Sequence, residues 1–115
     1  MDKFAHLRPN AEPQLQLDMA VCDALNAEPA LYEGTTRTLE GLNATVQIRT
    51  KRGDVVVFRL VESEEPGVTV EALACDRNEV YRSFKTTVPF EDIRVAMKMA
   101  VNEALTTFFP PMLLS

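Results

Sequence analysis

The side chains that most often perform nucleophilic and acid–base chemistry are scarce in this chain. It has one histidine, His6, and two cysteines, Cys22 and Cys75. A catalytic nucleophile needs a base within hydrogen-bonding reach, but His6 lies in residues 1–12, which show no periodicity and which we interpret as a mobile arm. The densest polar cluster, residues 75–79, has the composition of a turn. We therefore expect a protein that is not an enzyme.

The sequence also predicts no metal and no cofactor. Metal sites need clustered ligands, whereas the histidine and the cysteines are far apart, and the acidic run Glu62, Glu64 and Glu65 is typical of a solvated loop. Only four glycines are present, and none forms a phosphate-binding loop. Two cysteines are too few for a disulfide framework, so we expect both to be buried free thiols.

A group of basic residues gives one candidate binding site. If Arg49, Arg59 and Lys85 share a sheet face with Tyr81, the group could bind phosphate or a nucleic-acid strand, with the ring as a stacking platform. Ion pairing of the same cations with Glu71 on a neighbouring strand is the simpler interpretation. The net charge of −5 opposes nucleic-acid binding, so this anion-binding face remains an alternative.

The C-terminal tail is unusually apolar. Five of the last eight residues are large and hydrophobic: Phe108, Phe109, Met112, Leu113 and Leu114. Large apolar patches are seldom exposed. The tail therefore either folds back onto the domain itself or forms part of an interface with a second copy or another protein.

The elements that would position these residues begin with a predicted β-meander over residues 46–88. A three-residue loop ending at Gly53 predicts a hairpin that pairs Thr50 with Asp54 and Ile48 with Val56. This register places one set of residues on a purely apolar face: Val46, Ile48, Val56, Phe58 and Leu60. The opposite face is half apolar, with Val55, Val57 and Val61 beside Arg49 and Arg59. Such a face is usually covered by a helix, a partner or a second copy.

Apolar spacing of three and four residues predicts a helix on each side of this meander. The first covers Pro13 to about Asn26, and the second is a long amphipathic helix from Ile93 to Phe108. Pro89 ends the fourth strand and is expected to open the last helix. Residues 36–39 are a candidate for an extra edge strand. The predicted fold is thus α+β: a helix, a four-stranded antiparallel meander and a helix packed on the sheet.

Length and composition predict one soluble domain. At 115 residues, with 46% hydrophobic and 25% charged residues, the chain is long enough for a single core. We expect an arm at 1–12, one domain at 13–109 and a tail at 110–115. No apolar run reaches the roughly 20 residues of a membrane span, so we expect a cytoplasmic protein. The chain is similar to small acidic secretion chaperones in size, acidity and its closing amphipathic helix, a likeness of composition only.

These observations predict a non-catalytic protein-binding module, an adaptor or chaperone-like protein, that is homodimeric. Its expected contact surface is the half-apolar face with Val55, Val57 and Val61, or the tail from Phe108 to Leu114. Two alternatives are open. One is nucleic-acid or phospho-ligand binding on the cationic face, and the other is a small-molecule pocket between the sheet and the C-terminal helix.

Overall fold

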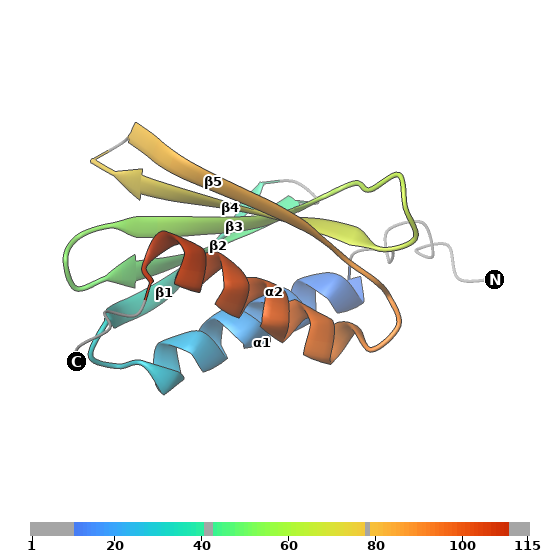
Figure 1. The fold of residues 1–115 in the computed structure, drawn as a ribbon, viewed down its shortest axis with the longest axis horizontal. Coiled ribbons are helices and arrows are strands. Elements are labelled where there is room, and N and C mark those ends of the chain that lie inside the picture. Colours follow the sequence, from blue (N-terminus) through green and yellow to red (C-terminus); the bar gives the residue numbers. More distant parts are fainter. Residues whose placement is uncertain (1–10, 41–42, 78, 111–115) are drawn as a thin grey trace.

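The protein is one antiparallel β-sheet with two helices on one of its faces (Figure 1). The computed structural model describes residues 11–40, 43–77 and 79–110. In chain order the elements are α1 (Ala11–Ala27), β1 (Tyr32–Glu40), β2 (Asn43–Thr50), β3 (Val55–Val61), β4 (Val68–Asp76), β5 (Glu79–Val88) and α2 (Ile93–Phe108). The strands lie side by side in the order β1-β2-β3-β4-β5, which confirms an antiparallel meander within an α+β fold.

The β2–β3 hairpin has the predicted register. Ile48 lies opposite Val56, and the Thr50 amide donates to the Asp54 carbonyl at 2.9 Å. Gly53 has φ +98°, the left-handed conformation that a three-residue loop of this kind needs at that position. A glycine here closes the loop without the steric cost that a Cβ would add. The loop therefore fixes which side chains of β2 and β3 point to each side of the sheet.

Both helices cover the same side of the sheet, which we call the inner face. Helix α1 lies against β1 and β2, α2 lies against β4 and β5, and the two helices contact each other (Figure 1). The predicted apolar face is this inner face: Val46, Ile48, Val56 and Phe58 are buried, and Leu60 packs against the core. Helix α1 contributes Leu17 and Val21, and α2 contributes Met97 and Val101 to the same core.

The helices run in the same direction, and both end at the β2–β3 hairpin. The Lys51 amide donates to the carbonyl of Leu31, just after α1, at 2.9 Å. The Arg52 guanidinium lies 5.7 Å from the centre of the Phe109 ring, just after α2. At this distance a cation and an aromatic ring attract each other. The hairpin loop therefore ties the C-terminal ends of both helices to the sheet.

Two local predictions are corrected by the structure. The candidate edge strand at 36–39 is real but longer, because β1 extends from Tyr32 to Glu40. Helix α2 begins at Ile93 rather than at Pro89, since Asp92 has φ +53° and a left-handed residue cannot continue a right-handed helix. In the β4–β5 turn Arg77 is left-handed, with φ +54°, and Asn78 lies outside the described residues.

Strand β5 contains a β-bulge that affects the placement of Tyr81. Ala74 lies opposite Arg82 and Cys75 lies opposite Val80, so Tyr81 is an extra residue on β5. Arg82 points to the inner face, where its Nη1 donates to the Thr107 carbonyl of α2 at 2.8 Å. A bulge shifts the alternation of side chains by one residue. From Arg82 to Val88 the pairing with β4 is regular.

Among the described residues, no helix combines the length and the apolar character needed to cross a membrane.

Candidate protein-binding surface

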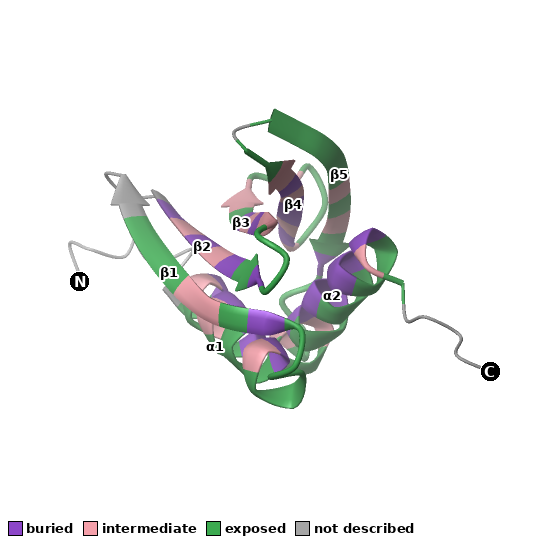
Figure 2. Ribbon diagram, turned by 90° about the vertical axis from the view of Figure 1, so that its left-hand side faces the viewer, coloured by how far each residue is buried: buried purple, intermediate pink, exposed green. Residues whose placement is uncertain are grey.

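The side of the sheet opposite the helices, here called the outer face, is not covered by any described helix or strand (Figure 2). Strand pairing places five apolar side chains next to one another on it, and we call them the apolar patch: Val55, Val57, Leu73, Cys75 and Val80. The first four are half-buried, and Val80 is 51% exposed. Val61 is on the same face at the far end of β3, opposite Thr69.

Only the β3 members of this patch, Val55 and Val57, were predicted from the sequence. The other members depend on the registers of β3 with β4 and of β4 with β5, which place Leu73 opposite Val57 and Cys75 opposite Val55. Once that register is known, the alternation of side chains along β4 places Leu73 and Cys75 on the outer face. Val80 joins the patch only because of the bulge, which no sequence pattern marks.

Ion pairs lie beside the apolar patch on the outer face. Glu71 is bridged by Arg59 from β3 and by Lys85 from β5, whose Nζ is 3.4 Å from Glu71 Oε2. The Glu71 side chain is only 9% exposed, whereas those of Arg59 and Lys85 are 49% and 64% exposed. Arg49 pairs with Glu33 of β1 at 3.4 Å. All three cations of the candidate anion-binding face thus have carboxylate partners within the chain.

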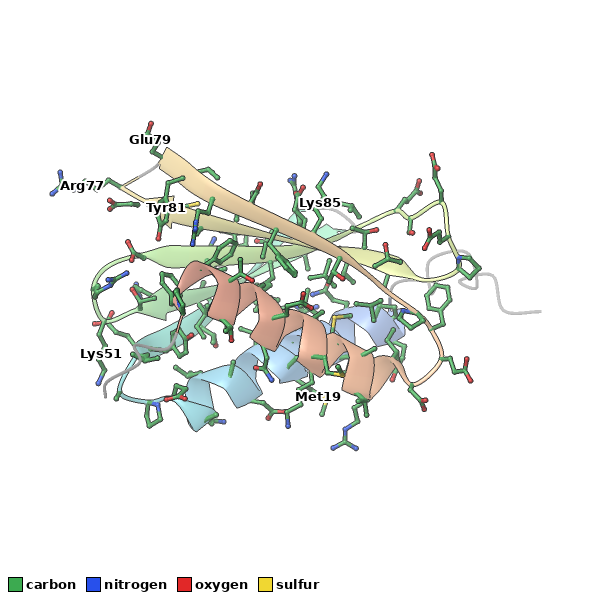
Figure 3. All side chains as sticks on the ribbon, in the orientation of Figure 1. Met19, Lys51, Arg77, Glu79, Tyr81 and Lys85 are labelled. Carbon is green, nitrogen blue, oxygen red and sulfur yellow. The ribbon has the colours of Figure 1, made fainter. Side chains whose placement is uncertain are left out.

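The fourth residue of that candidate face, Tyr81, lies elsewhere. The bulge places it beside Arg52, Asp54, Asp76 and Glu79, which together line a depression of about 510 Å³. Figure 3 shows Tyr81 and Lys85 at separate positions along the molecule. Partial burial raises the pKa of Tyr81, and the nearby Asp54 carboxylate raises it further. The ring is therefore surrounded mainly by acidic groups and does not supply a stacking platform next to Arg49 and Arg59.

The predicted tail surface is divided by the structure. Phe108 is a core residue with 5% exposure, so it offers almost no area to a partner. Phe109 is half-buried and packs edge-to-face on Phe108, with ring centres 6.3 Å apart. It lies in a groove of about 460 Å³ that is also lined by Leu31 and Tyr32. Met112, Leu113 and Leu114 lie outside the described residues.

The gap between the sheet and α2 is filled by side chains. Phe58, Met97 and Val101 are fully buried there. The groove at Phe109 and an adjoining one of about 390 Å³ are at the C-terminal end of the helices, not beneath α2. No buried side-chain polar atom among the described residues lacks a hydrogen-bond partner. The observation that would favour a small-molecule site under α2, an unpaired buried polar group, is thus not found in this part of the chain.

The two cysteines considered for catalysis lie on different elements, Cys22 on α1 and Cys75 on β4. Cys22 is exposed on α1, which corrects the expectation that both thiols are buried, and Cys75 is half-buried in the apolar patch. His6 lies outside the described residues. Within the described ranges no three Cys, His, Asp or Glu side chains are grouped so that they could hold a metal ion.

Comparison with known proteins adds no relative: no family model, no curated protein and no solved structure matches the chain significantly.

Proposed function

We propose that this protein is a non-catalytic protein-binding module, an adaptor or chaperone-like protein, that acts as a homodimer and binds its partner on the outer face of the sheet. The observation that carries the proposal is the apolar patch on a face that no described element covers. Exposed apolar area of this kind, bordered by polar groups, is characteristic of interaction surfaces. The paired ions at Glu71 and Arg49 form such a border.

The ion pairs also bear on what the surface binds. Arg49 pairs with Glu33, and Arg59 and Lys85 share Glu71, so two carboxylates offset part of the charge of these three cations before any ligand arrives. Binding to a nucleic acid depends on cations that are free to neutralise phosphates. Binding of a protein partner does not depend on free cations. It requires an apolar centre, which the apolar patch supplies, and a polar rim around it.

The test is affinity capture from a lysate of the host, with the tagged protein as bait and with half of each sample treated with nuclease. We expect a stoichiometric protein that survives nuclease with the wild type and is lost with Val57→Lys, which puts a charge into the centre of the patch. Met99→Lys is the matched control, because Met99 is 65% exposed on α2, on the opposite side of the molecule. Capture of the same partner by Val57→Lys would refute the proposal, and material lost on nuclease treatment would favour the cationic-face alternative.

A further inference from the structure

One edge of β5 is a long run of backbone that no described strand covers. Strand β5 is an edge strand of the sheet: it pairs with β4 on one side and with no described strand on the other. Figure 2 shows β5 exposed over most of its length. An edge strand presents unpaired N–H and C=O groups, which can pair with another strand.

The devices that usually protect an edge are weak in β5. Its bulge at Tyr81 disturbs only the first part, and Arg82 to Val88 remain regular. There is no proline in this strand. Lys85 is a device of this kind, and its pairing with Glu71 of β4 weakens it without cancelling its charge, because Glu71 also pairs with Arg59. Three apolar side chains close to this edge pack against the core and are only half-buried: Phe84 on β5, and Ile93 and Ala96 on α2.

We infer that the protein forms a homodimer by antiparallel pairing of β5 with β5 of a second copy. This inference rests on the homodimer of the proposed function and adds the geometry of its interface, which involves no other partner. It would join two five-stranded sheets into one continuous sheet and place the two outer faces side by side. The occupant of the β5 edge is thus a second copy of this chain.

Charge explains why β5 rather than the other edge, β1, would form the interface. Helix α1 lies beside β1 and β2 and carries three acidic residues and no basic one: Glu12, Asp18 and Asp23. Of these, Asp18 pairs with Arg37 of β1 at 3.3 Å. Pairing through β1 would bring two such helices together in a chain whose net charge is −5. Pairing through β5 keeps them apart, and β5 itself has two cations, Arg82 and Lys85, against Glu79. Like-charge repulsion therefore favours the β5 edge.

The symmetry of the pairing limits its register. When two copies of one strand pair antiparallel, opposite residues must lie on the same face of the sheet. The two-fold axis therefore lies midway between the two copies of one residue, which is here called the residue at the axis. An axis at Lys85 would place two lysines opposite each other, which is unfavourable. An axis at Phe84 pairs the two phenylalanines on the helix side and places Ser83 opposite Lys85 of the second copy. No like charges then face each other within Arg82 to Thr86.

Substitution of Ser83, which is exposed on the outer face, tests this register because the two possible charges have opposite effects. Ser83→Glu would form two ion pairs with the two Lys85 side chains, and Ser83→Lys would create two like-charge contacts. By sedimentation equilibrium on the full chain, we expect Ser83→Lys to raise the dimer dissociation constant about tenfold, and Ser83→Glu to lower it severalfold. Circular dichroism at low protein concentration should show the same fold for both variants.

The matched controls are Thr36→Lys and Thr36→Glu, which introduce the same charges at an exposed outer-face position of the other edge strand, β1. We expect neither to change the dissociation constant. A strictly monomeric wild type at high micromolar concentration, or a response at Thr36 instead of Ser83, would overturn the inference. Loss of the dimer with Val57→Lys would show that the faces rather than the edges associate, and would overturn it as well.

Failure of this inference is distinguishable from failure of the proposed function. A chain that is dimeric but insensitive at Ser83 contradicts the β5 interface and leaves partner binding on the outer face to the capture experiment. The opposite outcome is a dimer that responds to charge at Ser83 while Val57→Lys still captures the partner. That result contradicts the proposed binding face and leaves the β5 interface in place.

Discussion

On the inner face of the sheet, Val56 and Phe58 are fully buried beneath the helices, whereas Val55 and Val57 of the same strand are half-buried on the outer face. The inner face is filled by apolar side chains from both helices. The outer face instead combines an apolar patch with a nearly buried carboxylate and its two cations. One strand thus contributes to the core on one side and to a surface on the other.

The largest expected contrast is between two neighbours on β3. Phe58→Ala removes a fully buried side chain from the inner face and should lower the free energy of unfolding by about 3–5 kcal/mol. Val57→Ala removes a smaller, half-buried side chain and should cost about 1 kcal/mol or less in the monomer. Urea denaturation at low protein concentration measures both. Similar losses for the two variants would mean that the outer face is as well covered as the core.

The ion pairs on the outer face should respond asymmetrically to substitution. Glu71→Gln leaves Arg59 and Lys85 without their partner, but both are largely exposed to water, so we expect a loss of about 1 kcal/mol. Arg59→Met combined with Lys85→Met leaves a nearly buried carboxylate unpaired and should cost about 2–3 kcal/mol. Denaturant unfolding of the two proteins provides the comparison. Equal costs would show that Glu71 is solvated in the folded protein.

Thiol labelling compares the outer face with the helix layer. Cys22 is exposed on α1 and Cys75 is half-buried in the apolar patch, so Cys22 should react severalfold faster with a maleimide. Mass spectrometry of partly labelled protein gives both rates. If the outer face binds a partner, labelling of Cys75 should slow further when the captured protein is added, while Cys22 serves as the internal control. Unchanged Cys75 labelling in the complex would argue against binding at the patch.

The smallest expected effect is on the stability of the fold at alkaline pH. Burial of Tyr32 on the inner side raises its pKa above 10.0, and the Glu28 carboxylate adds to the shift. Above the ordinary tyrosine pKa, the unfolded chain loses this proton while the folded chain keeps it, so stability falls as the pH rises. Tyr32→Phe should make the stability curve flatter in this range. An unchanged slope in thermal melts recorded from pH 9 upward would contradict this prediction.

Sequence patterns were sufficient where local chemistry determines structure. Gly53 gave the hairpin register, and apolar spacing gave the Ile93–Phe108 helix, because turn conformation and helical periodicity depend on neighbouring residues. The pairing of Arg59 and Lys85 with Glu71 followed from strand order. The order of the elements and the β2–β3 register were therefore predictable from the sequence.

Features that depend on irregular backbone or on tertiary packing were not predictable. Tyr81 shares odd numbering with Lys85, so strict alternation placed both on one face, but a single extra residue in β5 separates them. The left-handed Asp92 delays α2 by a few residues. That both helices lie on one face is decided by how they pack against each other and the sheet, which the spacing of apolar residues within each helix does not specify.

The parallel helices have an electrostatic consequence. Their peptide dipoles point the same way, so each contributes about half a negative charge at the hairpin loop and half a positive charge at the other end of the molecule. Lys51 and Arg52 lie at the negative ends, where they offset this unfavourable alignment. In a dimer paired through β5, the two-fold axis would turn the second pair of helices around. The dipole components in the plane of the sheet would then cancel, whereas in a monomer they add.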